Sequence, residues 1–478
     1  MIAFLVFLAL LVAVFASFYL KRFKLCLLLI FLTSFQTRMF VSLDPMLHPW
    51  DERYHALVAK NLLSDPLHPM LIKEPAISFE KENWTGNQTW VHKQPLPLYS
   101  MAMSIAVFGT KAWAVRLPSV LLGSLCTFFV FIIGFRLWDE KVGLIASFLY
   151  ATNGFLIEQA GGRVPTDHID AFHLIFTLSS IAMVVEYHVR QKDGFLYLAG
   201  VFLGCAILSK WLTALIVFPV FFFLSFRDIG FKSFLISCIK IALPAIIVAA
   251  PWQIFIYQNF PEEAAIESAS NWAHIIEVLD GMEGGPLFHI DKIRMLFGDF
   301  IYLPLILFVY LIIRRGLFSK EMAVFIWLFI PLLFFSLVAT KMRGYTSFAA
   351  PALFLMSAVS WFEIRDMVQE KHRKIWLGLG ILCLGLSLRF SFERIKFFQS
   401  QEEAIAIRES IFKLEELGMQ DGVVVFNNPY PIESMFFNGG TSYSWCPNEK
   451  ELLEGDFEYL ILDENCSLSF GRRVESPF

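Results

Sequence analysis

Long apolar runs are the feature that most constrains how this chain can fold. They are about 16–24 residues long and recur from the first residue to near residue 390. A helix of that length crosses the roughly 30 Å hydrocarbon core of a bilayer. Hydrophobic residues make up 56% of the chain and charged residues only 17%, whereas a soluble protein carries roughly a quarter charged residues. The sequence therefore predicts a mainly α-helical, polytopic membrane protein.

Basic residues indicate how the spans are oriented. Every second short connection between apolar runs carries Lys or Arg, beginning with Lys21, Arg22 and Lys24. The positive-inside rule places such connections in the cytoplasm, so both termini are expected outside. The first run lacks a preceding basic segment and a following cleavage site, and we interpret it as a retained span rather than a signal peptide. Twelve spans are expected, near residues 1–20, 25–43, 116–136, 142–158, 169–187, 195–210, 211–226, 233–256, 297–313, 322–339, 346–362 and 375–390.

Three polar segments are then expected on the outer face. Two are the loops 44–115 and 257–296 of a transmembrane domain that covers residues 1–391. The third is the tail, residues 392–478, which we expect to form a small soluble α/β domain. We interpret this domain as a structural cap rather than a site of chemistry.

The tail carries the signals of regular structure. Residues 401–417 have helical spacing, and 423–426 and 459–462 are short apolar runs typical of buried strands. Cys446 and Cys466 also lie there and could form a disulfide in an oxidising compartment, which their spacing does not decide.

The distribution of charge favours an enzyme of the membrane surface. Ionisable residues collect at span ends and in the outer loops rather than at span centres, where a charge costs about 2.5–3.5 kcal/mol on insertion scales. An ion-coupled transporter or a flippase would be expected to place such groups near the midplane. The net charge of −4 argues against a nucleic-acid partner.

Two clusters in the first outer loop could carry chemistry. Asp51 and Glu52, followed by Tyr54, form a paired carboxylate that could accept a proton from a hydroxyl group. The alternative is that they open an amphipathic helix. Further on, Lys93 follows His92 and could hold a phosphate at headgroup depth, or could simply extend its charge to the interface.

Two more clusters are expected at outer turns. A glycine-rich turn carries Arg163, Asp167 and His168. The sequence is equally compatible with a functional site at this turn and with a purely structural role. The remaining cluster consists of cations and a tyrosine at two hairpin tips, namely Lys210, Lys341, Arg343 and Tyr345. Cations of this kind opposite carboxylates describe a site for a phosphorylated substrate, and the alternative is anchoring at the interface.

Taken in order, these clusters resemble motifs of the GT-C class of integral-membrane glycosyltransferases. The resemblance covers roughly residues 44–360 and is to bacterial members of the protein mannosyltransferase family, including the lipid A aminoarabinose transferases. The residues that carry it are Asp51-Glu52, Lys93-Gln94-Pro95-Leu96, Arg116-Leu117-Pro118-Ser119, Asp167, Leu208-Ser209-Lys210-Trp211, and Lys341 with Tyr345 and Pro351. The chain departs from the family pattern at Gln94, where Pro is usual, and at Trp211, where Gly is usual. It also has an additional first span.

The resemblance implies a donor that is a polyprenyl phosphate carrying one sugar. Asp51, beside Glu52, would be the base that activates an acceptor hydroxyl, and Asp167 would orient the acceptor or the sugar. Cations would neutralise the phosphate as it leaves, and single displacement would invert the anomeric centre. The residues assigned to the phosphate are Lys93, Lys210 and Arg343, with Lys341 in reserve. Those assigned to substrate contact are Tyr54, His92, Arg163, His168 and Tyr345.

The sequence leaves alternatives open for the metal, the acceptor and the class of reaction. No cofactor is required by the sequence, although His92 with His289 or His274 could hold a divalent metal. His92 stands where aminoarabinose transferases carry a metal-binding Glu. The acceptor could be a lipid, a glycan or a protein hydroxyl. The resemblance and the short loops imply a bacterial inner membrane with the active site and tail facing the periplasm. An oligosaccharide ligase and a lipid or solute transporter are the alternative functions.

Overall fold

A computed structural model describes residues 1–164, 168–298, 301–447, 457–462 and 473–474 of the chain. The chain divides into two compact units, each built from several segments. The span unit comprises Met1–Val41, Ser119–Phe255 and Ser270–Phe398. The loop unit comprises Ser42–Pro118, Ile256–Ala269 and Gln399–Phe478.

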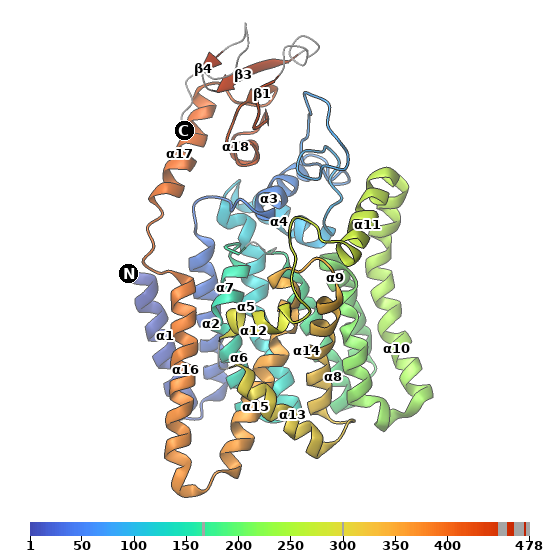
Figure 1. Ribbon diagram of the computed structural model, residues 1–478, viewed down its shortest axis with the longest axis vertical. Coiled ribbons are helices and arrows are strands. Elements are labelled where there is room, and N and C mark those ends of the chain that lie inside the picture. Colours follow the sequence, from blue (N-terminus) through green and yellow to red (C-terminus); the bar gives the residue numbers. More distant parts are fainter. Residues whose placement is uncertain (165–167, 299–300, 448–456, 463–472, 475–478) are drawn as a thin grey trace. The chain divides into compact units, whose positions relative to one another are not determined.

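Apolar helices make up most of the span unit (Figure 1). Eight helices of the described chain are long and apolar enough to cross a membrane, or nine if the bent pair α12–α13 is one span. The polytopic helical prediction is confirmed at this level. With the shorter helices included, the helical segments of this part of the chain are α1 (Ile2–Tyr19), α2 (Phe23–Ser42), α5 (Ala112–Leu137), α6 (Glu140–Ala151), α7 (Gly154–Ala160), α8 (Asp170–Arg190), α9 (Gly194–Lys210), η1 (Trp211–Ile216), α10 (Val217–Asn259), α12 (Phe288–Phe297), α13 (Tyr302–Arg315), α14 (Lys320–Leu337), η3 (Arg343–Ala349), α15 (Ala350–Met367), η4 (Glu370–His372) and α16 (Arg373–Ile395).

Two regions account for much of the difference from twelve expected spans. The run expected at 142–158 is broken between α6 and α7, because the side chain of Asn153 accepts a hydrogen bond from the Leu156 amide and starts a new helix. The apolar stretch Gly194–Asn259 counts once although it is 66 residues long. Its backbone is interrupted at Trp211 (φ 63°) and at Gly230 (φ 74°). At about 1.5 Å per residue, an unbroken helix of that length would be about 100 Å long, several times a bilayer core.

The additional first span packs against the last helix. α1 lies beside α16 (Figure 1), and the ring centroids of Phe4 and Phe392 are 5.5 Å apart. Phe7 and Ile395 belong to the same buried apolar cluster. The first helix is therefore integrated into the span unit.

The loop unit holds shorter helices and one sheet. Its helices are α3 (Asp51–Asn61), α4 (Pro95–Phe108), the first half of α11 (Pro261–Ile276), α17 (Glu402–Glu416) and α18 (Pro431–Asn438). Its strands are β1 (Val423–Phe426), β2 (Thr441–Ser442), β3 (Glu458–Leu462) and β4 (Arg473–Val474). They form one parallel sheet in the order β2-β1-β3-β4. All four residues of β1 are buried, as expected for an inner strand of a parallel sheet.

The tail's elements coincide with the apolar patterns of the sequence. α17 falls within the helical pattern at 401–417, β1 occupies 423–426, and β3 covers 459–462. Cys446 is disulfide-bonded, and Cys466 lies outside the described residues.

Small residues let two membrane helices approach closely. Gly200 and Gly204 lie one turn apart on α9. A Cβ added to Gly200 would lie 2.2 Å from the carbonyl oxygen of Ile241 on α10, and one added to Gly204 would lie 2.6 Å from Cβ of Val248. Such contacts are common between membrane helices, because no hydrophobic effect drives helices together in lipid.

Substituting Gly200→Ala should therefore separate α9 from α10 and destabilise the protein by about 1–3 kcal/mol, the usual cost of overpacking. Thermal unfolding of the purified protein in detergent would measure the loss. Gly194→Ala is the matched control on the same helix, because a Cβ there meets no atom within 4 Å. Equal stability of the two variants would contradict the close contact.

Candidate active site

Asp51 is a partly exposed carboxylate at the start of α3. A carboxylate in the first turn is favoured by the helix dipole, which explains why a helix begins at Asp51 and Glu52. The Lys93 ammonium donates a hydrogen bond to Asp51 Oδ2 at 3.1 Å. Burial opposes ionisation of Asp51, but Lys93 and the rings of His55 and His92 outweigh it and hold the pKa of Asp51 below its usual range. With a third of its side chain exposed, Asp51 is charged and accessible, as a general base must be.

Glu52 is turned inward and bound on both oxygens. Arg116 donates from Nε to Oε1 at 2.6 Å and from Nη2 to Oε2 at 2.9 Å. The same guanidinium binds the carbonyl oxygens of Ser42, Asp44 and Met46. Both side chains are buried, with 0% of Arg116 and 2% of Glu52 exposed. This pair fixes the start of α3 to the start of α5 and to the chain that leads from α2.

His92 lies in an aromatic and acidic environment in the same unit. Its Nδ1 is 2.9 Å from Oε2 of Glu267. The imidazole stacks on Trp84, with centroids 4.5 Å apart and planes 8° from parallel. Trp90 contacts its edge at 5.5 Å. The ring is therefore fixed in orientation beside the Asp51–Lys93 pair.

The aromatic residues of the first loop have mainly internal partners. Trp90 is fully buried and donates from Nε1 to the carbonyl oxygen of Trp84 at 2.8 Å. Tyr54 is buried against Trp84, and its hydroxyl accepts a hydrogen bond from Arg53 at 3.1 Å. These residues support the first loop from within.

In the span unit, Lys210 is brought together with Asp170 and Tyr345. Lys210 ends α9 and donates to Oδ1 of Asp170, the first residue of α8. Its ammonium lies 5.4 Å from the Tyr345 ring centroid. Asp170 is buried and Gln159 lies 3.4 Å from its other oxygen. The carboxylate predicted from the sequence for this turn is Asp167, which lies outside the described residues.

The two cations that precede Tyr345 differ in environment. Lys341 is buried and donates to the carbonyl oxygens of Ser336 and Val338, at the end of α14. It therefore satisfies carbonyls that a helix end leaves without partners. Arg343 opens η3 and is exposed. Within the described part of the chain, no ion pair holds the Arg343 side chain.

Of the remaining residues of the glycine-rich turn, Arg163 is half-buried and His168 is buried. Arg163 donates to the carbonyl oxygen of Ile395, the last residue of α16, at 2.6 Å. His168 is 1% exposed. Both residues therefore have surroundings typical of structural support.

The candidate metal ligands are distributed over both units. His92 pairs with Glu267 in the loop unit, and His289 is buried on α12 in the span unit. Among the described residues, no group of three His, Cys, Asp or Glu side chains is arranged to hold a metal ion.

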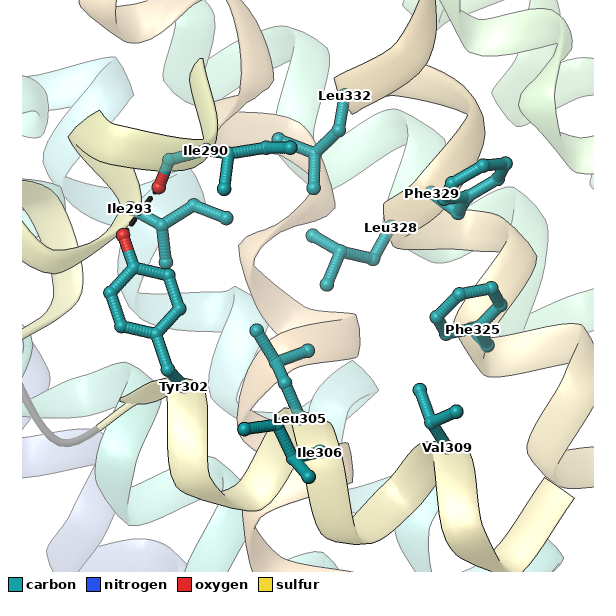
Figure 2. A pocket seen from close by; sticks show the side chains of 10 residues that line it. All are labelled: Ile290, Ile293, Tyr302, Leu305, Ile306, Val309, Phe325, Leu328, Phe329 and Leu332. Carbon is teal, nitrogen blue, oxygen red and sulfur yellow. Dashed lines mark hydrogen bonds between the residues drawn. The ribbon is translucent and has the colours of Figure 1, made fainter. Parts of the chain in front are cut away.

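An apolar pocket of ≈ 210 Å³ lies in the span unit (Figure 2). The side chains come from α12, α13 and α14, and Tyr302 turns its hydroxyl away from the centre to bond the Ile290 carbonyl oxygen. The lining residues are Ile290, Ile293, Tyr302, Leu305, Ile306, Val309, Phe325, Leu328, Phe329 and Leu332. Such a lining suits a hydrocarbon chain and offers no ligand for a charged group.

Sequence reasoning missed three residues that the structure brings into these clusters. Arg116 appeared only as part of a motif, and Asp170 was not among the predicted site residues. Glu267 lies far along the chain from its partner His92, and no local pattern marks it. A buried cation was also overlooked within α2, where Arg38 bonds the Ser34 hydroxyl at 2.6 Å.

Comparison with known sequences shows that the chain is similar to sugar transferases of membranes. Residues 92–255 match the family model of dolichyl-phosphate-mannose-protein mannosyltransferases. The chain is 25% identical over 320 residues to the undecaprenyl phosphate-alpha-4-amino-4-deoxy-L-arabinose arabinosyl transferase of Pseudomonas aeruginosa (strain UCBPP-PA14), covering 62% of this chain and 54% of the relative. The Aeromonas hydrophila enzyme of the same description is 24% identical over 342 residues, covering 65% and 58%. The chain thus spans about half the length of the curated relatives it matches.

Comparison with solved structures shows the fold. The chain superposes on ArnT from Cupriavidus metallidurans bound to undecaprenyl phosphate with a TM-score of 0.65 and 14% identity, covering 94% of this chain and 87% of that one. It superposes on the oligosaccharyltransferase AglB from Archaeoglobus fulgidus with a TM-score of 0.53 and 14% identity, covering 86% and 64%. Sequence and fold together make this chain similar to the GT-C glycosyltransferases, and among them to the aminoarabinose transferases, as the order of its motifs indicated.

Proposed function

We propose that this protein transfers a sugar from a polyprenyl-phosphate donor to an acceptor hydroxyl at the outer face of a bacterial inner membrane. The observation that carries the proposal is the Asp51–Lys93 pair, in which an accessible carboxylate is kept ionised by a lysine. The relatives support the donor class, since the names of the bacterial enzymes include undecaprenyl phosphate. The outer orientation rests on the basic connections between spans. We also propose that the chain crosses the membrane twelve times.

The proposed reaction is a single displacement that inverts the sugar. The acceptor oxygen attacks the anomeric carbon, a new glycosidic bond forms, and the bond from that carbon to the phosphate oxygen breaks. Asp51 takes the proton of the acceptor hydroxyl. The electron pair of the broken bond leaves with the polyprenyl phosphate, whose negative charge grows as the bond breaks.

Cations are assigned to the phosphate by their chemistry. In the loop unit this is Lys93, which also keeps Asp51 ionised. In the span unit, Lys210 and Arg343 have this role, and Tyr345 contacts Lys210. In this scheme Lys341 supports the end of α14, because its ammonium already donates hydrogen bonds to backbone carbonyl oxygens. The apolar pocket of α12–α14 suits a segment of hydrocarbon chain.

The carboxylates receive different roles for the same reason. Glu52 has both oxygens bound to Arg116, so we assign it to positioning rather than proton transfer. Asp170 orients Lys210, and the orienting role of Asp167 stays a prediction. Tyr54, Arg163 and His168 already contact or lie among protein groups, and we assign them to support of the fold.

Asp51→Asn should abolish most of the transfer, by about 10²–10⁴-fold, because an amide cannot accept the hydroxyl proton. The measurement is release of free polyprenyl phosphate from a panel of polyprenyl-phosphate monosaccharides, with membrane extract as acceptor. Asp65→Asn is the matched control, as Asp65 is an exposed carboxylate shortly after α3. A folded wild-type protein that turns over no donor would overturn the proposed function. Full activity of Asp51→Asn would remove Asp51 as the base.

Lys93→Met should move the acidic limb of the pH–rate profile to higher pH. Lys93 stabilises the charged form of Asp51, so its removal raises the pKa of Asp51 and requires a higher pH to ionise the base. The measurement is kcat against pH at saturating donor. Lys81→Met is the control, because Lys81 pairs with Glu262 and Glu263 instead. An unchanged acidic limb in Lys93→Met would show that ionisation of Asp51 does not limit the rate at low pH.

A further inference from the structure

The faces of α3 have separate partners. Asp51, at its first position, contacts Lys93. Arg53 and Lys60 are seven residues apart, which is close to two helical turns, so they share one face. Asp51 precedes Arg53 by two positions and therefore lies on roughly the opposite face. The partners of Arg53 and Lys60 both come from α18 of the tail.

Arg53 is paired with a buried carboxylate. Its Nη1 is 3.3 Å from Oε1 of Glu433, and only 2% of the Glu433 side chain is exposed. The other oxygen, Oε2, is buried without a hydrogen-bond partner in the described part of the chain. Burial raises the pKa of Glu433, and the Arg53 guanidinium opposes that rise. A buried carboxylate of this kind depends on its cation, so α3 and α18 are linked by charge.

Lys60 is bound to the other end of α18. Its ammonium donates to the carbonyl oxygens of Met435 and Phe436, each at 2.8 Å. Both belong to the last turn of α18, where helix carbonyls lack intrahelical partners and the helix dipole favours a cation. Arg53 and Lys60 thus hold α18 near its first and last turns, which fixes both the rotation and the position of α3 against it.

Other contacts fasten the tail to the chain on either side of α3. Gln401 donates to Oδ1 of Asp44 at 3.1 Å, before α3. After α3, the Thr441 hydroxyl donates to the Glu74 carbonyl oxygen at 2.9 Å, and the Tyr443 hydroxyl accepts from the amide of Ala76 at 3.1 Å. The tail therefore contacts the segment that carries Asp51 at several points.

We propose that the tail positions the base, with α18 holding α3 through Arg53 and Lys60 so that Asp51 meets Lys93 in the geometry required for proton transfer. The inference rests on the proposed function and assigns Arg53, Lys60 and Glu433 as positioning residues. Misplacement of a reacting group by about 1 Å can cost roughly 10²-fold in rate. A rigid attachment on the face opposite Asp51 limits such movement and leaves Asp51 itself accessible.

Kinetics of Lys60→Met and Glu433→Gln test the proposal. Each should lower kcat by roughly 10–100-fold, with KM for the donor changed less than about threefold, and should shift the acidic limb of the kcat profile to higher pH as Lys93 loosens from Asp51. Lys60→Arg should restore most of kcat, because it keeps a donor to the α18 carbonyls. Lys413→Met, at an exposed lysine of α17, is the control that should equal wild type.

Hydrogen exchange of the same proteins separates this proposal from the proposed function, because it needs no turnover. Amides of α3 should exchange faster in Lys60→Met and Glu433→Gln than in wild type and Lys413→Met. Those of α8, in the span unit, should be unchanged. Unaltered exchange of α3 in both variants would overturn the inference, whatever the wild type transfers. So would a kcat that falls only in proportion to the folded fraction, with the pH profile unmoved.

Discussion

The arrangement of the loop unit depends on one buried ion pair. Arg116 and Glu52 are both shielded from solvent, and the guanidinium also binds three carbonyl oxygens of the segment that follows α2. Two charges removed from water are stable only when each is fully bound, and these hydrogen bonds meet that condition. As a result the end of α2, the start of α3 and the start of α5 converge on one guanidinium, and Asp51 is left at the edge of this arrangement.

Neighbouring carboxylates have thereby acquired opposite roles. Asp51 and Glu52 differ by one position on α3, which turns their side chains about 100° apart. Asp51 contacts Lys93 and keeps a third of its side chain exposed, whereas Glu52 is buried against Arg116. Environment rather than residue type therefore decides which of them could act as a base. The same reasoning applies to Lys341 and Arg343, because the Lys341 ammonium is bound to backbone carbonyl oxygens whereas the Arg343 side chain is exposed.

The departures from the family pattern have local structural consequences. Trp211 stands where Gly is usual, and its backbone adopts φ 63° and ψ −156°, a conformation that glycine reaches without strain and that costs other residues about 1–3 kcal/mol. This strained residue follows Lys210 directly, at the junction of α9 and η1. His92, which stands where the aminoarabinose transferases carry Glu, meets Glu267 on α11. Together with Trp84 the pair fixes the imidazole beside Asp51 and Lys93.

The sequence by itself determined the membrane class, the family resemblance and most helical segments, because apolar runs and ordered short motifs are local properties of a chain. It also located the helix and two strands of the tail, whose apolar patterns are equally local. Tertiary structure decided which carboxylate is exposed, that Glu267 meets His92 from 175 residues away, and that Asp170 meets Lys210. It also decided that the tail binds α3. The spacing of Arg53 and Lys60 was visible in the sequence, but their partners Glu433 and the α18 carbonyls are about 380 residues distant, and a contact at that separation depends on the folded chain alone.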